Sequence, residues 1–256
     1  MKNKDYFIRK YLENRPMFLA IIRSQEAVLF QKHNYVIKGK VLDFGCGDGF
    51  FTEIVFGKGK IDVGLDLKNS RALRADENKT YKKVVYYDGK KIPFPDKYFS
   101  TVISNCVLEH IPNLKQSLSE IKRVLKPKGF FLTSVMTDRW EDYLFGKNII
   151  GNKYLQIMRK RQEHYNLLSS KQWNSIFEKT GFKIIKTDDY MNKKQSQIMD
   201  LFHYLSLPSL ISHKFTNKWV LFPKWYKYLF MDKYIDNLLL ERKIKEGSAQ
   251  FYLLKV

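Results

Sequence analysis

The stretch Val41-Leu42-Asp43-Phe44-Gly45-Cys46-Gly47-Asp48-Gly49-Phe50-Phe51 decides the fold. Its apolar start predicts a buried strand, its three alternate glycines predict a tight loop, and residues 52–56 begin a helix. Glycine reaches φ values that other residues avoid, and without a Cβ it lets a ligand lie against the backbone. The free N–H groups at a helix start suit an anionic or strongly polar ligand. A purely structural strand-to-helix turn is the alternative explanation.

A second short strand, Ile61-Asp62-Val63-Gly64-Leu65-Asp66, ends in a carboxylate. In a nucleotide-binding βαβ unit an acid about twenty residues after the first glycine binds the ribose hydroxyls. The glycine spacing here is G-x-G-x-G rather than the G-x-G-x-x-G of dinucleotide sites, and nothing marks a second mononucleotide half. The pattern therefore favours adenosine attached to a group other than pyrophosphate.

Four later stretches accompany the glycine loop, and they follow it in order at residues 87–89, 92–100, 102–111 and 120–129. Together, over residues 38–136, these motifs resemble motif I and the later motifs of the class I S-adenosylmethionine (SAM)-dependent methyltransferases, in the branch usually called methyltransferase type 11. The resemblance implies SAM as the cofactor and S-adenosylhomocysteine as its product. It also implies an enzyme that transfers a methyl group.

The same resemblance implies a role for each polar strand end. Asp66 would bind the ribose hydroxyls and Leu67 would pack on the adenine, while Asp88 would accept from the adenine amino group beside Gly89. The methionine portion would lie against the loop and the floor near the sulfonium, contacting Asp43, Gly45, Cys46, Gly47, Gly49, Asn105 and Cys106. Solvated strand-end acids are the alternative for Asp66 and Asp88, and Asp48 is expected to cap the helix.

Alternating apolar strands and helices predict the rest of the core. Strands are expected at 40–44, 61–65, 84–87, 101–104, 130–135, 183–186 and 249–254, with helices at 114–126 and, Ser-capped, at 169–181. Such alternation implies ligands beyond the carboxyl ends of parallel strands. We therefore predict an α/β, Rossmann-like, seven-stranded, mostly parallel sheet with helices on both faces and helical insertions before strands 6 and 7.

Four segments are expected along the chain. Residues 1–38 form a helical cap, which either closes the site or only covers the sheet edge. Residues 39–190 form the SAM-binding core with an insertion at about 138–168, and residues 249–256 form its last strand. Residues 191–248 form an aromatic- and lysine-rich insertion that ends in a helix over 234–245.

Composition indicates a cytoplasmic protein. The 256 residues include only two cysteines, which give no disulfide framework and no metal-ligand spacing. No signal peptide precedes the first helix, and no apolar run reaches the roughly 18 residues that a spanning helix needs. The net charge of +20 has three explanations, in this order: lysines spread over solvated faces, attraction to an anionic membrane surface at its inner face, and nucleic-acid binding.

Aromatic residues alternate with lysines at 215–230, which suits a surface lying among lipid headgroups. The side chains expected to enter the headgroup layer are Trp219, Phe222 and Trp225. The alternative is a helical lid whose aromatic side chains pack onto the core.

A sulfonium methyl is already electrophilic, so direct displacement needs a positioned nucleophile and no covalent enzyme intermediate. A hydroxyl acceptor would need a base, and histidine is the suitable type near neutral pH. His110 and His164 are the candidates, with His203 third, and a structural role is the alternative for each. No metal is expected. An activated carbon acceptor would need no base.

The insertions resemble methyltransferases of bacterial glycan and glycolipid assembly, which implies a hydroxyl of a sugar or lipid-linked glycan as the acceptor. The alternative enzyme is a C- or O-methyltransferase of a quinone-like or other small hydrophobic molecule. An inactive SAM-binding fold that serves as an interaction protein is the alternative of another class. The sequence does not give the oligomeric state, and no RNA-binding motif accompanies the positive charge.

Overall fold

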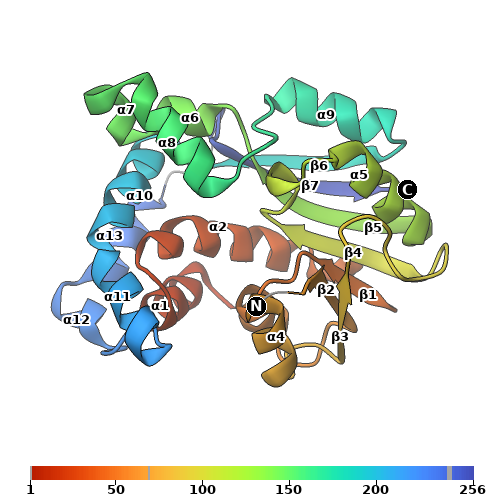
Figure 1. Ribbon diagram of the computed structural model, residues 1–256, viewed down its shortest axis with the longest axis horizontal. Helices are drawn as coiled ribbons and strands as arrows, with labels where there is room; N and C mark the ends of the chain where they lie inside the picture. The colour runs from red at the N-terminus through yellow and green to blue at the C-terminus, as the bar shows by residue number, and fades with distance from the viewer. Residues whose placement is uncertain (1, 69, 241–243) are drawn as a thin grey trace. The chain divides into compact units, whose positions relative to one another are not determined.

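The computed structural model describes residues 2–68, 70–240 and 244–256. Its seven-stranded sheet has the order β3-β2-β1-β4-β5-β7-β6 (Figure 1). The strands are β1 Val41–Phe44, β2 Val63–Leu67, β3 Lys83–Tyr87, β4 Phe99–Asn105, β5 Leu125–Met136, β6 Lys183–Tyr190 and β7 Ala249–Lys255. The pairs β1–β2, β1–β4, β2–β3 and β4–β5 are parallel. The Val256 N–H donates to the Gly129 carbonyl at 3.0 Å, so β7 runs antiparallel to β5. The predicted Rossmann-like sheet is confirmed.

The strand order decides where a ligand can lie. From the adjacent pair β1 and β4, the chain adds β2 and β3 on one side and β5 on the other. Right-handed crossovers then place the helices after β1 and β2 on one face and the helix after β4 on the opposite face. The carboxyl ends of β1, β2 and β4 lie together at one end of the sheet, here called the sheet edge, at the point where the strand order reverses. Open α/β sheets bind ligands at this point.

Helices of the sheet-containing unit cover this sheet. They are α3 Phe50–Phe56, α4 Ser70–Glu77, α5 Leu114–Val124 and α9 Ser170–Lys179, with 3-10 turns η1 Asn34–Val36 and η2 Leu108–His110. Leu118 and Ile121 of α5 and Trp173 of α9 share one buried cluster with the strand residues Val102 and Phe131. The predicted Ser cap of α9 is confirmed, because Ser169 and Gln172 form a capping box.

Two predicted boundaries differ from the structure. The helix expected over 114–126 ends at Val124, because Leu125 already has extended backbone and pairs with Phe99 of β4. The strand expected over 61–65 is β2 at 63–67. Asp62 lies before the ladder, where its carboxylate accepts from the Val41 N–H at 2.9 Å and from Lys82 Nζ at 2.7 Å. This shift places Asp66 inside the strand rather than after it.

The chain divides into two compact units. The helical unit comprises residues 1–31, 139–162 and 189–249, and the sheet-containing unit comprises residues 32–138, 163–188 and 250–256. The helices that belong wholly or mainly to the helical unit are α1 Lys4–Asn14, α2 Phe18–Lys32, α6 Arg139–Tyr143, α7 Phe145–Ile150, α8 Asn152–Gln162, α10 Lys193–Leu205, α11 Leu207–Thr216, α12 Trp225–Tyr228 and α13 Met231–Leu238. The helix predicted over 234–245 thus begins earlier and ends at Leu238, while residues 241–243 of that range lie outside the described residues.

An ion pair and hydrogen bonds join segments of the helical unit that are far apart in sequence. Arg9 of α1 pairs with Asp232 of α13 at 3.1 Å, and the buried Tyr226 of α12 donates to Glu13 at 3.2 Å. Tyr154 of α8 donates to the buried carboxylate of Asp200 on α10 at 2.5 Å. Among the described residues, the helices are all too short or too polar to cross a membrane.

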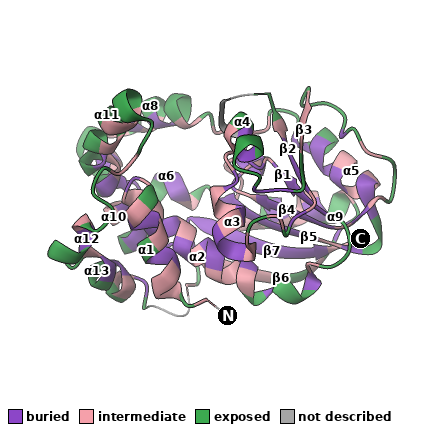
Figure 2. Ribbon diagram, turned by 90° about the horizontal axis from the view of Figure 1, so that it is seen from below, coloured by how far each residue is buried: buried purple, intermediate pink, exposed green. Residues whose placement is uncertain are grey.

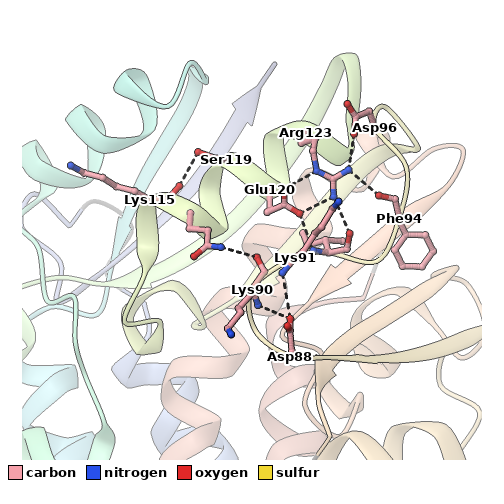
Figure 3. Close-up of polar contacts among 11 residues, drawn as sticks. Asp88, Lys90, Lys91, Phe94, Asp96, Lys115, Ser119, Glu120 and Arg123 are labelled. Carbon is pink, nitrogen blue, oxygen red and sulfur yellow. Dashed lines mark hydrogen bonds and ion pairs between the residues drawn. The ribbon is translucent and has the colours of Figure 1, made fainter.

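One arginine fixes the loop that follows β3 (Figure 3). Arg123 of α5 donates to the carbonyls of Ile92 and Phe94, each at 2.9 Å, and to the carboxylates of Glu120 and Asp96, each at 2.7 Å. Glu120 also accepts from the Ile92 N–H at 2.9 Å. Arg123 holds the pKa of Glu120 below its usual range. The loop after Asp88 is therefore tied to α5 by the Arg123 and Glu120 side chains.

The substitution Arg123→Ala should lower the free energy of unfolding by about 2 kcal/mol, because it leaves a half-buried set of acceptors without their donor. Guanidinium unfolding followed by circular dichroism measures this change. Asp96→Asn is the matched control, since Asp96 is 70% exposed and its loss should change stability by less than about 0.5 kcal/mol. Equal effects of the two substitutions would show that the arginine network does not hold the loop.

Candidate functional site

The glycine loop between β1 and α3 has a left-handed backbone. Gly45, Gly47 and Gly49 have φ values of 76°, 54° and 76°. A Cβ on Gly45 would lie 2.5 Å from a methyl carbon of Val107, so only glycine fits there without a shift of that side chain. A Cβ on Gly47 would have no atom of the described residues within 4 Å. The backbone at Gly47 is therefore open to a ligand.

Asp66 connects the end of β2 to this loop. Its Oδ2 accepts from the Gly47 N–H and its Oδ1 accepts from the Leu67 N–H, each at 2.7 Å. The carboxylate of Asp66 therefore fixes the glycine loop from the end of β2.

The exposed side chain of Leu67, which follows Asp66, lies beside Gly89. Leu67 is 49% exposed, and a Cβ on Gly89 would lie 3.4 Å from its Cδ2. Asp88 is exposed, and its Oδ1 accepts from the N–H groups of Lys90 at 2.9 Å and Lys91 at 3.4 Å (Figure 3). The bond from Lys90 is the main reason why the pKa of Asp88 is low. The structure thus brings Leu67 and Gly89 together, with an ionised acceptor adjacent in sequence.

Asp43 lies in β1, just before the glycine loop. It is 5% exposed, and its Oδ2 accepts from the hydroxyls of Thr52 and of Tyr81, the latter at 2.6 Å. Burial raises the pKa of Asp43 to about 6. These bonds make Asp43 a brace between β1, α3 and the chain before β3. Its contact with the methionine portion of SAM stays a prediction. Cys46 is also buried.

The end of β4 lies against the loop through Val107, the side chain that Gly45 approaches. Asn105 Oδ1 accepts from the Ser134 hydroxyl at 2.6 Å, and the Cys106 N–H donates to the Ser134 carbonyl at 3.1 Å. Cys106 has a φ of 51°, a conformation that persists in non-glycine residues only where the surroundings impose it. Asn105 and Cys106 therefore lie at the same sheet edge as the glycine loop.

His110 and His164 form a pair. The ring centroids lie 4.8 Å apart at 32°, although 53 residues separate these histidines in sequence. Burial, with a smaller effect of His110, lowers the pKa of His164 to about 3. His203 belongs to α10 of the helical unit, where its ring lies 4.7 Å from that of Phe18. Among the described residues, no three His, Cys, Asp or Glu side chains are arranged to hold a metal ion.

Sequence reasoning missed several residues that support this edge. Thr52 and Tyr81 hold Asp43, Ser134 holds Asn105 and Cys106, and Asn166 donates to the carbonyls of Leu108 and Ile111 beside His110. No motif or spacing marks these residues, because their partners lie on other strands or turns.

A family model described as a methyltransferase domain (Methyltransf_23) matches residues 9–187. The chain belongs to this family. The matching model carries a different label from the type 11 branch that the motifs resemble. This methyltransferase uses SAM, which is the donor of the transferred methyl group.

Similar proteins agree with this assignment. The methyltransferase is 28% identical over 180 residues to the uncharacterized protein MJ1123 of Methanocaldococcus jannaschii, which covers 70% of this chain and 80% of that protein. It is 30% identical over 159 residues to the ubiquinone biosynthesis O-methyltransferase of Glaesserella parasuis, covering 58% of this chain and 63% of that protein. It is 40% identical over 134 residues to the sterol 24-C-methyltransferase ERG6B of Gibberella zeae, covering 48% of this chain and 34% of that protein.

Solved structures share the fold of the methyltransferase. A SAM-dependent methyltransferase from Archaeoglobus fulgidus has a TM-score of 0.54 at 19% identity, covering 91% of this chain and 94% of that one. The [4+2]-cyclase SpnF has a TM-score of 0.58 at 16% identity, covering 91% of this chain and 80% of that one. A cyclase among the neighbours shows that this fold alone does not name a reaction.

The residues at the sheet edge fit SAM. The open backbone at Gly47, the carboxylate of Asp66 and the exposed Leu67 beside Gly89 are residue types that would suit a polar amino-acid portion, a ribose and an adenine. Bound SAM supplies an electrophilic methyl group. The chain's own residues would bind and orient it, with Gly45, Gly47 and Gly49 giving backbone contact and Asn105 and Cys106 forming the adjacent strand end.

The substitution Asp66→Ala should weaken SAM binding about 100-fold, since it removes the carboxylate predicted to accept from the ribose hydroxyls and also removes the bond to Gly47. Titration calorimetry measures the Kd, and circular dichroism checks the fold. Asp62→Ala, at an acid four residues earlier that lies before β2 and has no part in the site, is the control and should leave the Kd unchanged. Unchanged affinity in Asp66→Ala would remove the ribose assignment.

The substitution Asp43→Asn should change how stability depends on pH. A raised pKa in the folded state means that the stabilising contribution of protonated Asp43 is full below about pH 4 and is lost as the pH rises through about 6. The shift corresponds to about 3 kcal/mol. Between pH 4 and pH 7 the wild type should therefore lose stability relative to Asp43→Asn by up to that amount in guanidinium unfolding. A constant difference across this range would contradict the buried-carboxylate assignment.

Proposed function

We propose that the methyltransferase transfers the methyl group of SAM to a hydroxyl oxygen, with the pair His110–His164 as the base. The observation that carries this proposal is the position of the pair. His110 lies on η2, which begins two residues after Cys106, just beyond the carboxyl end of β4. A base on this turn stands beside the sheet edge where the resemblance places the sulfonium.

The pair is suited to accept one proton. His164 is neutral at physiological pH, because its pKa is about 3. When His110 takes up a proton, the neutral His164 ring therefore does not repel its positive charge. In this proposal the hydroxyl oxygen of the acceptor attacks the methyl carbon, S-adenosylhomocysteine leaves, and His110 takes the proton of the hydroxyl. His164 limits the orientation of the His110 ring.

Backbone bonds hold the two histidines together. The Tyr165 and Asn166 N–H groups donate to the Glu109 carbonyl at 2.8 and 3.0 Å. The Asn166 side-chain amide donates to the Leu108 carbonyl at 3.1 Å and to the Ile111 carbonyl at 2.7 Å. Asn166 thus clamps the turn that carries His110 from both sides, which preorganises the pair.

The acceptor in this proposal is a hydroxyl of a sugar or lipid-linked glycan, used beside an anionic membrane. Exposed aromatic side chains and lysines within 215–230 support a lipid environment. A quinone-like or other small hydrophobic acceptor is the second candidate, which the similarity to a ubiquinone biosynthesis O-methyltransferase favours. An inactive interaction protein would bind SAM and show no turnover with any acceptor.

The substitution His110→Ala should lower kcat about 100-fold while the Kd for SAM stays within twofold, because a general base contributes to turnover and not to cofactor binding. Transfer of labelled methyl from SAM is measured with glycoside and quinol acceptors and with a membrane lipid extract. Asn166→Asp keeps the side-chain size but removes both donors, so it should lower kcat in the same direction by a smaller factor.

His213→Ala, at a histidine outside the pair, is the control and should leave kcat unchanged. A loss of SAM affinity in His110→Ala with unchanged kcat would assign the histidine to the cofactor site instead. Labelling confined to quinols would select the second acceptor class.

A further inference from the structure

Helix α11 presents an apolar stripe to solvent. Its ten residues include no buried one, and Figure 2 shows the helix mostly in the colour of exposed residues. Leu207, Leu210, Ile211 and Phe215 follow the spacing i, i+3, i+4, i+8, so they share one face. Ile211 is 60% exposed and Phe215 is 80% exposed. A stripe of this kind is normally buried against another element.

The aromatic residues of 221–230, the segment after α11, form two sets: some are hydrogen-bonded to α1 and the others are exposed. Trp225 Nε1 donates to the Leu12 carbonyl at 3.1 Å, and the buried Tyr226 donates to Glu13 at 3.2 Å, so both side chains fasten the segment to α1. The side chains of Phe222, Tyr228 and Phe230 remain 77%, 85% and 63% exposed. The segment is therefore held from one side by α1 and leaves large apolar side chains outward.

The charge of this region has one sign. Residues 201–231 contain Lys214, Lys218, Lys224 and Lys227 and neither Asp nor Glu. All four lysines are exposed. Lysine side chains extend their charge to headgroup phosphates while their stems cover apolar surface. Aromatic and aliphatic side chains between them can enter the boundary between headgroups and acyl chains.

We propose that the α11 stripe and the exposed side chains of 221–230, here called the lipid-facing surface, dock the methyltransferase on an anionic bilayer. The inference deepens the proposed function, since a docked enzyme meets a lipid-linked acceptor. A second copy of the chain fits this surface less well. A symmetric contact would bring eight lysines together with no acid of the same region to pair with them.

Co-flotation with vesicles tests the proposal. The full chain should bind vesicles of phosphatidylcholine with 30% phosphatidylglycerol at least tenfold more strongly than vesicles of phosphatidylcholine alone, and 0.5 M salt should reduce this binding (order-of-magnitude expectations). The triple variant Phe215→Ser, Phe222→Ser, Tyr228→Ser should reduce binding about tenfold. The matched control Tyr35→Ser, Ile149→Ser, Ile185→Ser changes three exposed apolar side chains elsewhere and should bind like the wild type.

A second variant set separates the lysines from the apolar side chains. Replacing the four lysines of the surface with glutamine should remove the preference for anionic vesicles, whereas replacing Lys171, Lys179, Lys183 and Lys186 should not. SAM affinity by calorimetry should be unchanged in every variant, which shows that each one folds. His110→Ala should still bind vesicles, so failure of the base assignment and failure of this surface are distinguishable.

Three results would overturn the proposal: wild-type binding equal for both vesicle types, equal losses in the triple variant and its control, or no vesicle binding. A dimer in analytical ultracentrifugation that the triple variant abolishes would assign the surface to self-association instead. Wild-type binding that is lost only in the variants of the lipid-facing surface supports docking on lipid.

Discussion

Three left-handed glycines and one carboxylate determine the shape of the chain at the carboxyl ends of β1 and β2. Gly45, Gly47 and Gly49 turn the chain from β1 into α3 within a few residues, at φ values that other side chains avoid. Asp66 then accepts from the Gly47 N–H at 2.7 Å and so joins β2 to that turn. Because the sheet is parallel here, both contributions arrive at the same edge. The close approach of Gly45 to Val107 adds the end of β4.

A buried carboxylate supports this edge from inside. Asp43 accepts two hydroxyl donors from elements that follow it in sequence, Thr52 on α3 and Tyr81 before β3. Buried polar groups stabilise a structure only when they are hydrogen-bonded, and a satisfied network then fixes one arrangement. Burial raises the pKa of Asp43 to about 6, so a proton can reside in the brace near neutral pH. The acid that opens the glycine motif is therefore part of the loop's framework.

The sequence allowed much of the core to be predicted, because its signals are local. Glycine spacing, apolar alternation and caps such as Ser169 depend on neighbours within a few residues. Similar local spacing also indicated Asp66, whereas Leu67 was nominated by the family resemblance. The brace of Asp43 and the clamp of Asn166 depend on contacts across 38 and 58 residues, which no local pattern records. The histidine pair could be nominated residue by residue, but its 4.8 Å separation could not.

In the helical unit, too, the sequence pattern of apolar residues does not identify the elements against which they pack. Amphipathic patterns predict helices at both ends of the chain but not that α1 pairs with α13, since a stripe specifies burial and not a partner. In 215–230, Trp225 and Tyr226 alternate with lysines just as Phe222 and Tyr228 do. The two sets differ in whether a polar atom of the side chain reaches an acceptor on α1. The indole N–H of Trp225 and the hydroxyl of Tyr226 reach acceptors on α1, whereas phenylalanine has no such atom to fasten it. Tyr228 has the hydroxyl and is still 85% exposed, so the position of α1 and not residue type alone decides which aromatic side chains are anchors.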